Sequence, residues 1–224
     1  MKRSISILLL CAVTFGVYAQ EKEQKNNSLM IFAHGGYAYS PNKNGKGLTS
    51  SSPDYAKKMS SGAGWNLQLF YRHKMFTVGM MYSGFTSKGE MEIASIDVSS
   101  QDKFINSDKI LTTYIAIQLG MRIPVGNSFA ICWNGGFGGM AYNNNSLVYG
   151  QPRIVKGSNL GVNLGAKAVY QFTNHFGISL EFMTISANIG KTNINYHQED
   201  ILVRYSPKIP LNQYLFSLGL TYSL

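Results

Sequence analysis

Hydrophobic residues recur at every second position over long stretches of this chain. The C-terminal segment shows it best: from Tyr214 to Leu224 the even positions are large and apolar, and most odd positions are small or polar. Successive side chains of a β-strand point to opposite faces of its sheet. The segment therefore predicts a strand with one apolar face and one face that is mostly small and polar.

The same alternation appears in further segments and predicts eight strands in all. In the first of them the facing stays open, because Met30 and Phe32 compete with Leu29 and Ile31 for the apolar face. The expected strands cover residues 28–40, 61–73, 75–87, 110–123, 128–141, 158–172, 175–188 and 212–224.

The connections between these strands alternate in length. Tight turns follow the second, fourth and sixth strands, and long segments, 41–60, 88–109, 142–157 and 189–211, follow the others. An even strand count with short turns at one rim and long loops at the other is typical of outer-membrane barrels. The pattern predicts an all-β fold, an eight-stranded antiparallel up-and-down transmembrane β-barrel. Outward aromatic residues should form a belt at the short-turn rim: Tyr71, Phe76, Phe129, Phe172, Phe176 and Tyr222.

The N-terminus has the features of a secretory signal peptide. Lys2 and Arg3 precede a short apolar run, and Val17 and Ala19 supply small residues for cleavage before Gln20. We expect a signal peptide over residues 1–19, a short segment over 20–27 and a barrel domain over 28–224. The second cysteine of the chain, Cys132, is then alone and should be a packed thiol.

Charged residues make up only 14% of the chain, and the formal net charge is +9. Basic residues in the expected loops, among them Lys57, Lys58, Arg153 and Lys156, would lie beside lipopolysaccharide and could pair with its phosphates. Simple solvation of these loops explains them equally well. We expect outer-membrane lipid and lipopolysaccharide as partners, and an extracellular partner at the long loops stays an option. Nucleic acid is not expected, because the charge is dispersed over separate loops.

The strand pattern, the glycine-rich hairpins and the terminal segment Leu218–Leu224 resemble the small eight-stranded outer-membrane barrels of the OmpA/OmpX type, in particular the barrel-only proteins of Bacteroidetes. The resemblance covers about residues 28–224. It implies an outer-membrane location and recognition of the last strand by the barrel insertion machinery. It implies the fold more strongly than any function.

The interior positions predict a polar network. Glu181 is the only acidic residue within an expected strand, and its parity points it inward. A hairpin that places Phe172 opposite Phe176 also places Lys167 opposite Glu181, and buried charges need such partners. A structural polar plug is favoured over an ion path, because eight strands enclose a space that side chains fill. The expected lumen residues are Lys167, Glu181, Arg122, Arg72, Gln68 and Asn134.

The search for catalytic chemistry gives a negative expectation. The four histidines lack metal-ligand spacing, although a weak site at His197, Glu199 and Asp200 stays open. No histidine of a well-defined strand has a serine nearby on its face, and no G-x-S-x-G motif is present. We therefore expect no catalytic residue, no metal and no cofactor.

The sequence thus predicts a structural or surface-interaction barrel with four long extracellular loops and a plugged polar lumen. Three alternatives stay open. They are a narrow pore or small-molecule transporter, a lipid A-modifying enzyme, and a soluble lipocalin-like carrier. The carrier fares worst, because its interior would have to be apolar.

Overall fold

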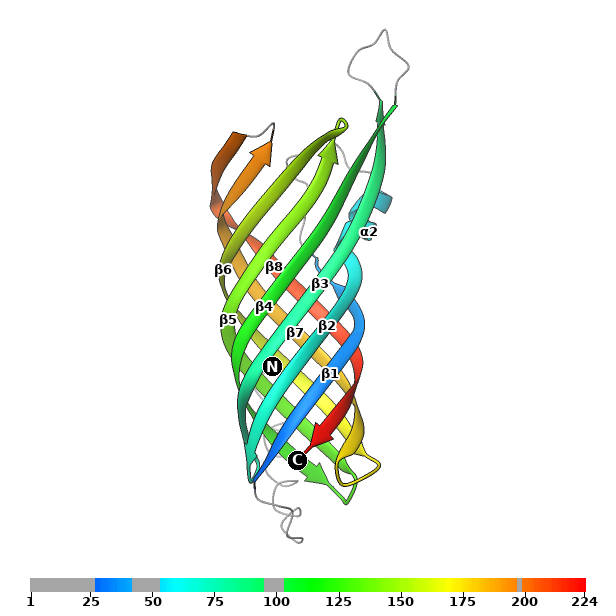
Figure 1. The fold of residues 1–224 in the computed structure, drawn as a ribbon, viewed down its shortest axis with the longest axis vertical. Coiled ribbons are helices and arrows are strands. Elements are labelled where there is room, and N and C mark those ends of the chain that lie inside the picture. The colour runs from blue at the N-terminus through cyan, green and yellow to red at the C-terminus, as the bar shows by residue number, and fades with distance from the viewer. Residues whose placement is uncertain (1–26, 42–52, 95–102, 197–198) are drawn as a thin grey trace, which may run out of the picture.

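Eight antiparallel strands and one short helix make up the part of the chain that the computed structural model describes, residues 27–41, 53–94, 103–196 and 199–224. The predicted signal peptide lies outside these ranges. Each strand pairs with its neighbours in sequence, and β8 also pairs with β1, which closes the barrel (Figure 1). Within these ranges no helix has the length and apolar character needed to cross a membrane. The elements are β1 (Asn27–Tyr39), α2 (Pro53–Ser60), β2 (Ser61–His73), β3 (Phe76–Ala94), β4 (Lys103–Val125), β5 (Phe129–Val148), β6 (Gln151–Gln171), β7 (Phe176–Tyr196) and β8 (Glu199–Ser223).

The strand that the sequence left ambiguous, β1, turns Met30, Phe32 and His34 into the barrel. Their alternate neighbours face outward. This facing is set on both edges of the strand, because β1 pairs with β2 on one side and with β8 on the other. The closure of the barrel, rather than the local pattern, therefore decides it.

A band of apolar side chains surrounds the barrel on its outer face, in the part nearest the short turns. Leu119, Val162 and Leu220 are well exposed there, and the six aromatic residues of the predicted belt face outward at its short-turn rim. A second belt, which the sequence analysis did not predict, borders the band at the other end. Aromatic rings of this kind lie at the two interfaces of a bilayer. The second belt comprises Tyr37, Tyr39, Trp65, Tyr82 and Tyr214.

The strands continue far beyond this second belt, and here the prediction of long loops is wrong for three of the four segments. Most of 88–109 and 189–211 is strand, and 142–157 holds only a two-residue turn, in which Tyr149 (φ 50°) and Gly150 (φ 76°) adopt left-handed conformations. Two successive positive φ values match the twist of a tight hairpin. The acidic residues Glu90 and Asp108 therefore also lie in strands, so Glu181 is not alone. In Figure 1 these extended hairpins form the end of the barrel opposite to the C-terminus and to the start of β1.

Candidate functional site

The six residues predicted for the lumen all lie inside the barrel. Gln68 and Glu181 are 0% and 1% exposed, and Lys167, Arg122, Asn134 and Arg72 are buried as well. They come from five strands, β2 and β4 to β7. The lumen is thus filled by side chains, as expected for an eight-stranded barrel.

Lys167 and Glu181 form the centre of this interior. The two residues lie directly opposite each other on β6 and β7, in the register that the sequence predicted, with 3.4 Å between Lys167 Nζ and Glu181 Oε1. Gln68 and Asn66 donate hydrogen bonds to the two carboxylate oxygens, at 2.9 and 2.8 Å. Lys167 also donates to Gln68. Lys167 and Glu181 therefore each have a partner of opposite sign and polar neighbours, which offsets the cost of their removal from water.

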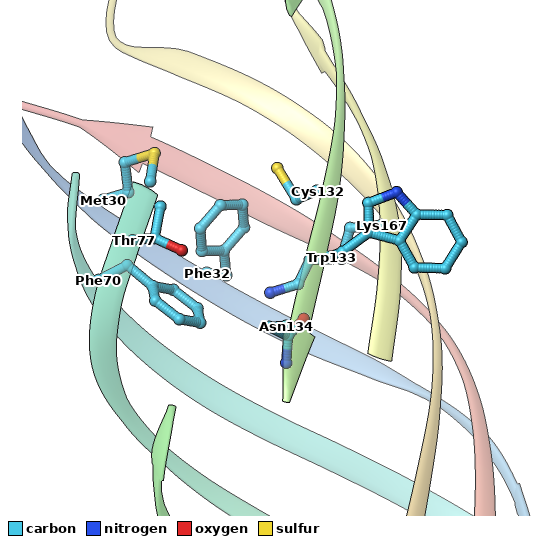
Figure 2. Close-up of a pocket in the computed structure, with 8 residues that line it drawn as sticks. All are labelled: Met30, Phe32, Phe70, Thr77, Cys132, Trp133, Asn134 and Lys167. Carbon is cyan, nitrogen blue, oxygen red and sulfur yellow. The ribbon is translucent and has the colours of Figure 1, made fainter. Parts of the chain in front are cut away.

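Two aromatic rings complete the surroundings of the lysine. Its Nζ lies 4.5 Å from the ring centre of Phe32 and 4.7 Å from that of Phe70, within the range of cation–π attraction. Beside them is a cavity of about 10 Å³, which holds a single water at most. Figure 2 shows that Phe32, Phe70 and Lys167 converge on this space, whereas the indole of Trp133 points away from it.

His34 joins the same network, and the sequence analysis missed it. Its Nδ1 donates to Asn66 Oδ1 at 3.0 Å and lies 3.5 Å from Glu181 Oε2, while its Nε2 lies 2.8 Å from Ser179 Oγ. The sequence expectation covered only histidines of well-defined strands and left His34 open, and the structure places a serine beside it. The signal was hidden because the facing of β1 was open and because Ser179 is 145 residues away in sequence.

The order serine, histidine, carboxylate is the one that activates a serine nucleophile. Here, however, Ser179 is 1% exposed, and Glu181 is already engaged by Lys167. The small cavity near the lysine is lined by neither Ser179 nor His34. The arrangement resembles a triad in its distances, with the serine buried inside the barrel.

A second polar group of residues lies across the lumen. Gln118 accepts hydrogen bonds from Asn134 at 2.9 Å and from Asn163 at 3.0 Å, and it donates to Asn163 Oδ1 at 2.7 Å. The predicted residue Asn134 thus belongs to this amide cluster rather than to the ion pair. Arg122 is also separate, because it bonds to Gln171 Oε1 at 2.9 Å near the short-turn end.

Apolar layers lie on both sides of the polar network. The inner layer, toward the short turns, consists of Met30, Phe32, Phe70, Ala130, Cys132 and Val169. The outer layer, toward the long hairpins, is larger and reaches from Met183 and Ile185 to Met59 of α2. Cys132 is a buried free thiol, as expected. The polar network is therefore enclosed between two apolar layers.

A further polar cluster lies at the outer mouth. Asp108 accepts hydrogen bonds from Tyr55 of α2 and from Asn144 (2.8 Å), and it lies 3.8 Å from Arg153 Nη2. Burial and this hydrogen bond raise the pKa of Tyr55 above its ordinary value. From the sequence, Arg153 was open to pairing with lipopolysaccharide or to simple solvation, but it turns toward Asp108 at the mouth of the lumen. The cluster joins α2 to the end of the barrel.

In the described part of the chain, no group of three or more His, Cys, Asp or Glu residues is arranged so that it could hold a metal ion. His197, the centre of the weak site considered from the sequence, lies outside the described residues.

A closed barrel with an outward apolar band between two aromatic belts defines an integral β-barrel protein of the outer membrane. The sequence profile of the outer membrane protein beta-barrel domain family matches residues 7–222, and the chain belongs to this family. The predicted location and family are thus confirmed, and the soluble carrier is excluded. The comparison with curated proteins found no match.

The comparison with solved structures found similarity to outer-membrane proteins at low sequence identity. A major outer membrane protein from Thermus thermophilus is 10% identical, with 88% of this chain and 99% of that chain covered and a TM-score of 0.56. Neisserial surface protein A is 10% identical, with coverages of 88% and 97% and a TM-score of 0.49. The outer membrane protease OmpT from Escherichia coli is 10% identical, with coverages of 91% and 99% and a TM-score of 0.48. At such identities the likeness concerns the fold alone.

Proposed function

We propose that this protein is a closed, non-catalytic barrel that acts through the surface it exposes outside the membrane. The observation that carries the proposal is that successive layers of side chains fill the lumen. The polar network around Lys167 and Glu181 lies between two apolar layers, and a hydrated ion would have to cross both. Apolar constrictions block ions because water is not stable between them.

A planar-bilayer measurement tests the closed state against the narrow pore. The purified full-length mature protein should give no discrete conductance steps. A variant that thins both layers, Phe70→Ala with Phe85→Ala, should give small steps, because each of these buried rings supplies much of the bulk of its layer. Regular steps from the wild-type protein would overturn the proposal and favour the pore or transporter.

A lipid A-modifying hydrolase is the second candidate, because Ser179 Oγ lies 2.8 Å from His34 Nε2. The neutral tautomer that donates from Nδ1 to Asn66 leaves Nε2 free to accept the serine proton, as a general base does. The burial of Ser179 speaks against it. A fluorophosphonate probe, which labels activated serines, should leave the folded protein unmodified. Labelling that disappears in Ser179→Ala would reverse the assignment.

A further inference from the structure

The outer face of the barrel carries a concentrated positive charge on three adjacent strands, above the second aromatic belt. Lys191 on β7 lies directly opposite Arg204 on β8, and both side chains are exposed. Like charges that face each other across a strand pair destabilise a sheet unless something compensates them. The pairing therefore indicates a site where an anion would be stabilising.

Two more cations extend this pair into a patch. Lys156 of β6 lies opposite Asn193, two residues from Lys191, which makes the two lysines diagonal neighbours on the outer face. The aliphatic stem of Lys208 runs along Gly190. A Cβ added at Gly190 would lie 3.5 Å from Cγ of Lys208. We name Lys156, Lys191, Arg204 and Lys208 the β6–β8 cationic patch.

Irregular strand pairing places these side chains together. The register shifts between Ile189 and Lys191 on β7, and the pairing of β6 with β7 shifts at the same level. Strict alternation from Ile185 and Ala187, which are buried, would point Lys191 into the lumen, but the next residue, Thr192, is the buried one. Bulges redirect side chains in this way and are frequent beside functional sites.

The patch lacks internal compensation. Its four cations make no ion pair with any residue that the structure describes. The carboxylate of Asp200, two outward positions from Arg204 along β8, accepts a hydrogen bond from Asn195 instead. On the opposite wall the corresponding pair, Lys88 opposite Lys109, is compensated, since Lys88 Nζ lies 2.6 Å from Glu90 Oε1.

The height of the patch indicates what it meets. Lys191 lies seven residues beyond Thr184, which is paired with Tyr214 of the second aromatic belt. At about 3.3 Å per residue and a tilt of about 40°, this is roughly 15–20 Å above the belt. At that height an outer leaflet presents the phosphorylated sugars of lipopolysaccharide rather than acyl chains.

We propose that the β6–β8 cationic patch binds the phosphate groups of lipopolysaccharide in the surrounding leaflet. Arg204 can hold a phosphate through two parallel hydrogen bonds, and the lysines add point charges. The proposal rests on the outer-membrane location and not on the closed lumen, so conductance and lipid binding fail independently.

The test compares two double variants that each remove two opposed cations, K191Q/R204Q in the patch and K88Q/K109Q on the compensated wall. Affinity for purified lipopolysaccharide is measured with the full mature protein in detergent, after heat-modifiable gel mobility has shown that each variant is folded. We expect K191Q/R204Q to bind at least about tenfold more weakly and K88Q/K109Q to bind within about twofold of wild type, because each lost phosphate contact removes a charge-assisted hydrogen bond. Chemically dephosphorylated lipopolysaccharide should bind all three proteins alike.

Other results would overturn the proposal. Equal losses in both double variants would mean that only the overall charge matters, and an unchanged K191Q/R204Q would mean that the patch is not a site. Competition by millimolar inorganic phosphate would identify a site for the free anion. If K191Q/R204Q weakened the binding of a soluble sulfated polysaccharide but left lipopolysaccharide binding unchanged, the partner would be a soluble polyanion.

Discussion

The membrane-spanning part of the barrel and the part beyond it differ in which side chains fill the lumen and which face outward. Between the aromatic belts the outer face is apolar, and the lumen holds Lys167, Glu181 and His34. Beyond the outer belt the lumen is filled by the apolar layer around Ile185 and Met140, while the outer face carries charges such as Lys191. Where lipid lies outside, the same continuous strands enclose a charged network next to the inner apolar layer, and where water lies outside they enclose the outer apolar layer.

The largest expected effect comes from breaking the ion pair between Lys167 and Glu181 in the membrane-spanning part. Glu181→Ala leaves Lys167 buried without its counter-charge and should lower the free energy of unfolding by about 3–5 kcal/mol. The double variant Lys167→Met with Glu181→Met should be closer to wild type, because it leaves no buried charge. Urea unfolding of the protein in lipid vesicles measures both. A double variant as unstable as the single one would contradict the assignment of the ion pair.

A substitution in the outer apolar layer sharpens the comparison on a single strand. Ile185→Ala removes a side chain that is 1% exposed, and it should cost about 2–4 kcal/mol through lost contacts and the cavity left behind. Its neighbour Thr184 faces outward, so Thr184→Ala is the control and should change stability by less than about 0.5 kcal/mol. Equal effects in the same unfolding experiment would mean that the outer lumen is not packed.

The smallest expected effect concerns the latch between α2 and the barrel mouth, the hydrogen bond from Tyr55 to Asp108. Because the pKa of Tyr55 is raised in the fold, its contribution to stability is complete below the ordinary pKa of 10.0 and is lost as the pH rises above that value. Tyr55→Phe removes the hydrogen bond to Asp108 and should cost about 1 kcal/mol. In a spectrophotometric titration, the difference between wild type and Tyr55→Phe should show one tyrosine that ionises late. A difference centred on the ordinary pKa of tyrosine would disprove the latch.

The accuracy of the sequence analysis follows the same division of the molecule. In the membrane, lipid demands an apolar outer face, so alternation marks the strands and their turns. Beyond the second belt water surrounds the barrel, so the outer face need not be apolar and the alternation is weaker. For this reason the sequence predicted a loop over 142–157, although most of this segment forms strands. The pairing of Lys167 with Glu181 was predictable because a tight turn sets the register of one hairpin. His34 was not, because its contacts with Asn66 and Ser179 depend on closure of the whole sheet.

The sequence by itself determined the membrane band, the number of strands and the register of the hairpin between β6 and β7, because each depends on alternation or turn length within a few residues. Only the tertiary structure decided the facing of β1, the height of the wall outside the membrane, the meeting of His34 with Ser179 and the outward turn of Lys191. Those features depend on contacts between strands that are distant in sequence, and on irregular pairing that shifts the alternation of a strand. A period-two pattern carries no information about either.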